Sequence, residues 1–137
     1  MEKIYLILLL TISFNLSAQS VTEFKSNKCT FWVNNNTPSV SYDIVTIRIN
    51  RPSGNVHFIL SSSDIISLKP VDGKVIKGSD SIGDYDSINY TKFNGGGHTQ
   101  IKIYKEIYKI VYIDKSFKGN VYTQVYDIND MYTNKLK

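Results

Sequence analysis

The chain has 137 residues, of which 42% are hydrophobic and 20% charged, and this length suits a single hydrophobic core. Its formal net charge of +4 is too small to indicate a nucleic-acid partner. Eight glycines and three prolines exclude a collagen-like or low-complexity chain, and a single cysteine excludes internal disulfides and thiolate zinc sites.

The first 18 residues, MEKIYLILLLTISFNLSA, have the pattern of a secretory signal peptide. Lys3 gives a positive start, residues 4–14 are mostly apolar, and Ser17 and Ala18 are the small residues before the expected cleavage point. The apolar stretch is shorter than the roughly 20 residues that a membrane-spanning helix needs. We therefore expect a cleaved signal peptide over 1–18, a periplasmic or secreted location, and no transmembrane segment in the mature chain 19–137.

The first predicted strand of the mature chain is 29–33, which contains the lone cysteine. Alternation places Cys29 on the same face as Phe31, so we interpret the thiol as a small hydrophobic side chain of the core. In an oxidising compartment the alternative is a disulfide with a second chain.

Beyond residue 29, short β-branched and aromatic runs alternate with turn residues. This pattern predicts an all-β fold: one antiparallel β-sandwich or small β-barrel of about seven to nine strands. Residues 42–49 and 56–60 have a clear period of two, which points Arg48 and His57 outward. The inward set comprises Val45, Ile47, Ile49, Val56, Phe58 and Leu60.

Turn chemistry divides the second half of the chain. Asp72 and Gly73 suit a two-residue hairpin turn between strands at 64–71 and 74–77, and Pro70 predicts that this hairpin lies at a sheet edge. Residues 101–113 also fit helical spacing, but we predict strands because Ile, Val and Tyr make up nine of the thirteen residues. The other expected segments are strands at 85–93 and 121–127 and an irregular tail at 129–137.

Residues 79–98 form an acidic segment, with three aspartates against one lysine. Hard oxygen ligands lie close together in it, as a calcium loop requires: Asp80, Asp84, Asp86 and Asn89. Because their order does not match the EF-hand template, we expect solvated loop acids and no cofactor. Weak calcium binding is the alternative.

Tyrosines near the C-terminus are the second candidate site. Two adjacent segments each carry them at a spacing of four, which in a strand places each set on one sheet face: Tyr104, Tyr108, Tyr112, Tyr122 and Tyr126. Lysines such as Lys109 lie between them. Amphipathic rings beside mobile cations suit a binding surface for a glycan or a partner protein. Aromatic packing between strands is the alternative.

The sequence lacks the usual catalytic signatures: no nucleophile elbow, phosphate-binding loop, HExxH helix or dinucleotide-binding glycine motif occurs. A signal peptide followed by an Asn-, Lys- and Ile-rich β domain is similar in composition to small exported proteins of AT-rich Gram-negative bacteria, and no motif names a family. We therefore hypothesise a non-enzymatic binding protein of a bacterial envelope, whose partner is a glycan or a protein that it inhibits. The alternatives are a hydrolase using carboxylates such as Asp84 and Asp86, and a structural subunit of a surface assembly.

Overall fold

The computed structural model describes residues 20–93, 97–104, 106–116 and 118–135, and these residues form strands and turns without a helix. The predicted signal peptide lies outside them. The strands of this part are Ser20–Val33 (β1), Ser39–Ser41 (β2), Val45–Arg51 (β3), Val56–Ile59 (β4), Ile65–Pro70 (β5), Ile76–Ser79 (β6), Asp84–Lys92 (β7), His98–Tyr104 (β8), Lys109–Lys115 (β9) and Val121–Lys135 (β10). Within the same ranges there is no helix long and apolar enough to cross a membrane.

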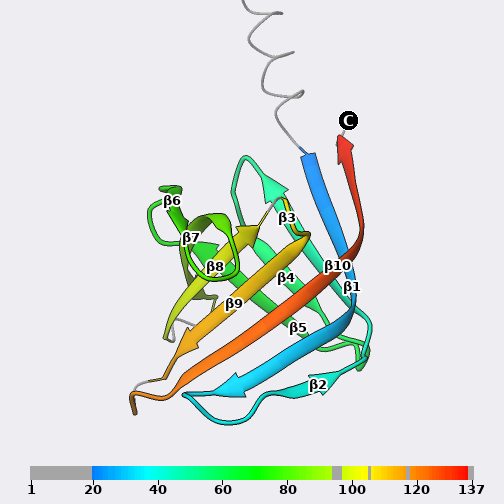
Figure 1. Cartoon of the computed structure of the whole chain (residues 1–137). Coiled ribbons are helices and arrows are strands. Elements are labelled where there is room, and N and C mark those ends of the chain that lie inside the picture. Colours follow the sequence, from blue (N-terminus) through cyan, green and yellow to red (C-terminus); the bar gives the residue numbers. More distant parts are fainter. Residues whose placement is uncertain (1–19, 94–96, 105, 117, 136–137) are drawn as a thin grey trace, which may run out of the picture.

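The strands form a small closed barrel (Figure 1). Their order is β10-β9-β8-β7-β5-β4-β3-β1, and β1 pairs in turn with β10, so eight antiparallel strands close on themselves. Two further strands extend the wall: β2 lies beside β1 and β6 beside β7. The prediction of an all-β fold with a small barrel is thus confirmed.

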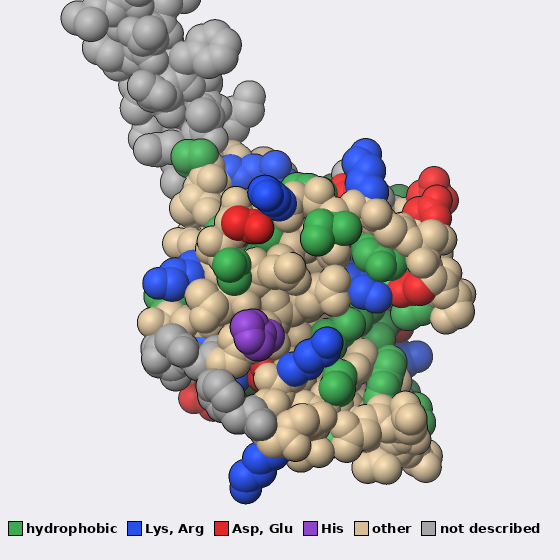
Figure 2. All heavy atoms as spheres, turned by 90° about the vertical axis from the view of Figure 1, so that its left-hand side faces the viewer, with side chains coloured by type: hydrophobic (Ala, Val, Ile, Leu, Met, Phe, Trp, Pro, Cys, Tyr) green, Lys and Arg blue, Asp and Glu red, His purple; other side chains and the backbone are tan. Residues whose placement is uncertain are grey.

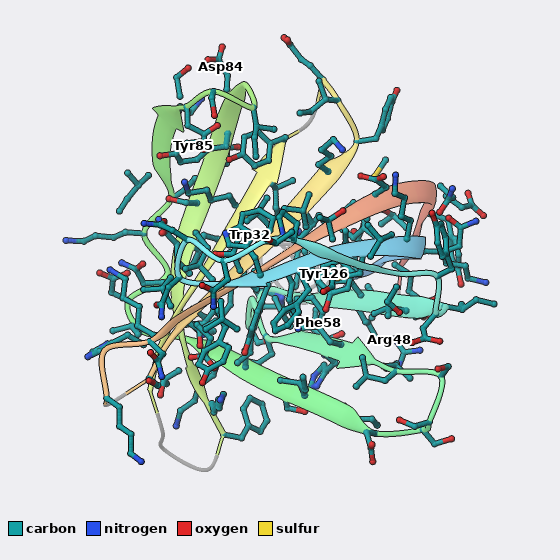
Figure 3. The ribbon with its side chains drawn as sticks, turned by 60° about the horizontal axis from the view of Figure 1, so that its bottom comes forward. Trp32, Arg48, Phe58, Asp84, Tyr85 and Tyr126 are labelled. Atoms are coloured by element: carbon teal, nitrogen blue, oxygen red, sulfur yellow. The ribbon has the colours of Figure 1, made fainter. Side chains whose placement is uncertain are left out.

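The barrel interior is filled by the residues that alternate inward. Val45, Ile47 and Phe58 are almost completely buried, as their spacing predicted. Phe58 meets the ring of Tyr112 edge-on at 5.2 Å and lies 5.5 Å from the ring of Tyr126. Figure 3 shows Phe58 and Tyr126 inside the barrel and Arg48 on the outside. Burying a side chain such as Phe58 contributes about 1.5–3 kcal/mol to folding.

The core has one feature that the sequence predicted, the packing of Cys29, and one that it did not, a second hydrophobic cluster. Cys29 packs half-buried against the inner cluster, and burial raises the pKa of its thiol, in line with its interpretation as a core side chain. A second cluster lies on the outer side of the barrel wall and comprises Tyr104, Val111 and Val125, with Trp32, Tyr85 and Ile113 packed against them.

The predicted hairpin around Gly73 is wrong. Gly73 does adopt the positive φ expected of a turn, +69°. However, β5 and β6 do not pair with each other: β5 pairs with residues 90–92 of β7, and β6 pairs with residues 84–87 of the same strand. The nine-residue β7 is long enough to pair with both, so Pro70 lies in the barrel wall opposite Tyr90 and not at an edge.

The chain ends also differ from the prediction. β10 continues to Lys135, where we expected an irregular tail from residue 129, and β1 begins at Ser20, nine residues before the predicted strand. These two segments pair with each other, from Ser20 opposite Lys135 onward. Pairing between segments so far apart in the sequence cannot be detected from local periodicity.

The strand directions define two ends of the barrel. One end of the barrel, called the open end, carries the connections β1–β2, β4–β5, β7–β8 and β9–β10. The connections β3–β4, β6–β7 and β8–β9 lie at the other, the far end.

Candidate binding site at the open end of the barrel

A hollow of about 590 Å³ enters the barrel at the open end. On this side β5 pairs with β7 only through Leu68, Lys69 and Pro70, so Ile65 and Ile66 border the hollow. Ile65 and Phe93 both line the hollow and are more than half exposed, and the Phe93 ring meets the ring of His57 edge-on at 5.8 Å. The rim of the hollow is therefore apolar and exposed to solvent.

Aromatic rings and a few polar groups line the hollow. The rings belong to Phe31, Phe93, Tyr112 and Tyr122, which come from four different parts of the wall. The polar groups are Lys92, Asp114 and Gln124. Concave sites of this size, mostly apolar with a small number of convergent polar groups, are typical of ligand pockets in proteins.

The charged pair in the hollow is held in place. Lys92 Nζ lies 2.9 Å from Asp114 Oδ2, and Thr99 Oγ1 donates to Asp114 Oδ1 at 3.5 Å. The register explains why both side chains point inward: Lys92 stands opposite the buried Leu68, and Asp114 opposite the buried Thr99. A fixed donor and a fixed acceptor thus lie side by side in an otherwise apolar wall.

The tyrosines deeper in the barrel stay protonated and orient their neighbours. Burial, with the charge of Asp114 as a second cause, raises the pKa of Tyr112 to about 12. Burial also raises the pKa of Tyr126, whose hydroxyl donates to Gln124 Oε1 at 2.6 Å. This bond fixes the orientation of the Gln124 amide, and the Gln124 side chain is part of the lining of the hollow.

The structure brings together three of the five tyrosines singled out in the sequence. Tyr112, Tyr122 and Tyr126 share the inner side of β9 and β10. Tyr104 belongs to β8 and turns to the outer side, and Tyr108 is exposed in the β8–β9 turn with a φ of +52°. The predicted single face is therefore split, because a turn separates residues 104 and 112.

Lys109 lies on the outer side of β9, away from the hollow. Its Nζ is 2.6 Å from Asp127 Oδ1, and Lys28 approaches the other oxygen of the same carboxylate at 3.8 Å. Exposed pairs of this kind contribute little to stability. The lysine is thus part of a surface ion-pair group and not of the hollow.

Tyr104 has a structural role at the far end. Its side chain is buried, its ring lies 5.4 Å from that of Tyr85, and its hydroxyl donates to Asp80 Oδ2 at 2.5 Å. Lys102 Nζ contacts the same oxygen at 3.1 Å. The backbone N–H groups of Ile82 and Gly83 donate to Asp80 Oδ1 at 2.9 and 3.3 Å.

The four oxygen-bearing residues of the acidic segment are not brought together. Both oxygens of Asp80 already accept hydrogen bonds from the protein, Asp84 and Asp86 lie on the inner side of β7, and Asn89 lies on the outer side. In the described ranges, no three His, Cys, Asp or Glu side chains are grouped so that they could hold a metal ion.

Sequence reasoning missed Phe31, Lys92, Asp114 and Gln124 as site residues. A signal for two of them was present: Asp114 and Gln124 are polar residues at inward positions of otherwise apolar alternating series. Lys92 gave no such signal, because its inward orientation depends on the pairing of β7 with β5.

Comparison of the chain with protein-family models and with curated protein sequences finds no match. The fold and the hollow nevertheless define a class of structure. In eight-stranded barrels the interior is either filled by side chains or wide enough for one small ligand. This barrel is filled in its middle and has a hollow at its open end.

Proposed function

We propose that the protein is a small exported binding protein of a bacterial envelope, without catalytic activity, and that it holds a glycan at the open end of its barrel. One observation carries the proposal: four aromatic rings and the polar groups of Lys92, Asp114 and Gln124 converge on one hollow.

Glycan chemistry matches this combination of groups. A sugar ring has apolar C–H faces, which pack on aromatic rings such as Tyr122 and Phe31, and hydroxyl groups that both donate and accept hydrogen bonds. Asp114 accepts from a hydroxyl, while Lys92 and the Gln124 amide donate to one. Because Lys92 and Asp114 form an ion pair, the hollow presents little net charge to a hydroxylated ligand.

The shape and the surrounding turns favour a glycan over a flat protein partner. Two of the tyrosines that were expected on an outer surface, Tyr112 and Tyr122, face inward and line the hollow, where a ligand that enters the barrel would meet them. Two of the connections that frame the entrance, 34–36 and 61–63, consist of three asparagines and three serines. Such small polar residues with tyrosines are typical of adaptable binding loops.

Retention of the purified mature chain on peptidoglycan and on a panel of immobilised polysaccharides tests this proposal. Tyr122→Ala should weaken binding to the retained glycan by about tenfold, as expected for one lost aromatic contact. Tyr108→Ala is the matched control, since this ring is exposed in a turn outside the hollow. If the two variants weaken binding equally, or if no glycan is retained, the open end is not a glycan site.

A second candidate function has its own structural support. Asp84 and Asp86 lie two residues apart on the inner side of β7 and line, with Glu106, a hollow of about 350 Å³ at the far end. Paired carboxylates are the catalytic groups of glycoside hydrolases. Release of reducing sugar from polysaccharides, abolished by Asp86→Asn without loss of folding, would favour a hydrolase; stable binding without release favours the binding protein.

A further inference from the structure

A smaller hollow, of about 240 Å³, lies on the outer side of the same barrel wall, over β7, β8 and β9. Four of the polar residues that line it lie on the outer side of the wall, beside Val71 and Ile113: Asn89, His98, Gln100 and Lys115. The register places them as two cross-strand pairs, Asn89 opposite Gln100 and His98 opposite Lys115. Figure 2 faces this side of the molecule and shows hydrophobic side chains with basic and some acidic side chains around them.

The four polar side chains have hydrogen-bonding capacity to spare. In the part of the chain that the structure describes, none of them makes a side-chain hydrogen bond or an ion pair. Asn89, His98 and Lys115 are exposed, and Gln100 is half-buried. A partner that accepts hydrogen bonds would therefore displace only water.

Among the described residues, no carboxylate lines the hollow. Asp114 is next to Lys115 in sequence, but it points to the inner side, where Lys92 neutralises it. Asp72, which follows Val71, turns back to accept from the Lys74 N–H at 3.0 Å. Lys69, exposed on β5 opposite Thr91, adds a further positive charge on this side. The local charge is thus positive, although acidic residues are close in sequence.

We propose that this outer hollow is an anion subsite, which binds the carboxylate of a uronic acid unit in the same glycan. The inference rests on the proposed function and names its ligand more closely: an acidic polysaccharide. A carboxylate would accept charge-assisted hydrogen bonds from Lys115 and further bonds from the amides of Gln100 and Asn89.

The two hollows lie on the two sides of one strand, so a single glycan molecule can contact both. They lie on opposite sides of β9, which contributes Tyr112 and Asp114 to the inner hollow and Ile113 and Lys115 to the outer one. His98 and Lys115 are the residues of β8 and β9 nearest the open end. A glycan whose end enters the barrel therefore reaches the outer hollow by passing over the rim beside β8 and β9.

The chemical shifts of side-chain amide groups in NMR spectra can detect ligand binding at each hollow separately. Gln124 reports on the open end, and Asn89 and Gln100 report on the outer hollow. The probes are trigalacturonate and its methyl ester, which share one backbone and differ in charge. We expect the acid to shift all three amide signals and the ester to shift only that of Gln124.

Two lysine variants sharpen the test. Lys115→Gln should weaken binding of the acid up to about fivefold, the effect of one exposed charge contact, and leave the ester unaffected. Lys118→Gln removes an exposed charge from the β9–β10 connection and should change neither. If the acid leaves the amide signals of Asn89 and Gln100 unshifted, the proposal of an anion subsite is wrong, whether or not the Gln124 signal shifts. If Gln124 is unmoved by both probes, it is the glycan site at the open end that fails.

Discussion

The two ends of the barrel use tyrosine in opposite ways. At the far end, Tyr104 is buried on the outer side of the wall, and its hydroxyl is bound to Asp80. At the open end, Tyr112 and Tyr122 line a hollow beside Lys92 and Asp114. The rings are the same, yet Tyr104 is buried with its hydroxyl bound to a carboxylate, whereas Tyr122 is half-buried at the entrance of a hollow.

The connections between strands cause this difference. The β6–β7 turn brings Asp80 against Tyr104, and its backbone N–H groups hold the carboxylate in place. No turn in the described ranges reaches Tyr122 in that way at the open end, where the wall between β5 and β7 is short. Aromatic rings with satisfied polar groups stabilise the fold, whereas rings beside accessible polar groups are suited to bind a ligand.

The largest change in the free energy of unfolding should come from removing the buried Tyr104 ring at the far end. Tyr104→Ala should lower the free energy of unfolding by about 3–5 kcal/mol, because it removes a buried ring and leaves a cavity. Urea unfolding followed by circular dichroism measures this change. Tyr104→Phe keeps the ring and should cost about 1–3 kcal/mol for the lost bond to a charged group. A loss below about 1 kcal/mol for the alanine variant would mean that the far end is not held together as described.

Acid should weaken the far end through Asp80. Burial alone would raise the pKa of this carboxyl, but hydrogen bonds from Tyr104, Ile82 and Lys102 outweigh it and hold the pKa below its ordinary value of 3.8. The stabilisation is therefore complete above that pH and is lost as the pH falls through the lower folded-state value. Stability measured from pH 6 to pH 2 should drop less steeply in Asp80→Asn than in the natural chain.

Glu23 provides an internal control for this experiment. Hydrogen bonds from Tyr132 and then Arg48 also lower the pKa of Glu23, so the protonation of Glu23 in acid contributes to the pH profile of both chains. Because it is present in both chains, the difference between them isolates Asp80. Identical pH profiles would show that the Asp80 carboxylate contributes nothing to stability.

A matching substitution at the open end should leave stability nearly unchanged. Tyr122 is only half-buried at the entrance, so Tyr122→Ala should lower the free energy of unfolding by less than about 1 kcal/mol. The same urea experiment checks this value. A loss as large as that of Tyr104→Ala would remove the contrast between the two ends.

The smallest effect is expected at Tyr108. This exposed residue has a φ of +52°, which costs a residue with a Cβ about 1 kcal/mol. Tyr108→Gly relieves that strain but increases the freedom of the unfolded chain, so we expect a net gain of about 0.5 kcal/mol or less. Thermal unfolding measures the change, and a clear loss would mean that the Tyr108 ring has a role in the fold.

Alternation in the sequence predicted the inner strands well. Val45, Ile47, Val56 and Phe58 are buried because a period of two has only one structural solution in a half-buried strand. Alternation could not predict pairings between distant segments. Such pairings are that of β10 with β1, which closes the barrel, and those of β7 with both β5 and β6.

The candidate site was partly predictable for the same reason. Tyr112, Tyr122 and Tyr126 were singled out, but their inward direction follows from barrel closure, which the sequence does not reveal locally. The separation of Tyr104 from Tyr112 depends on where the β8–β9 turn falls within an unbroken run of strand-forming residues. Lys92 and Asp114 meet only because β7 and β9 both flank β8.

Contacts between a bound glycan and the tyrosine rings test the central claim most directly. Isotope-filtered nuclear Overhauser spectra of the complex, with the glycan retained in the binding screen, report which rings lie within contact of sugar protons. The account predicts cross-peaks to Tyr122 and Phe31, and none to Tyr104 or Tyr85 at the far end. Cross-peaks to Tyr85 without any to Tyr122 would contradict it.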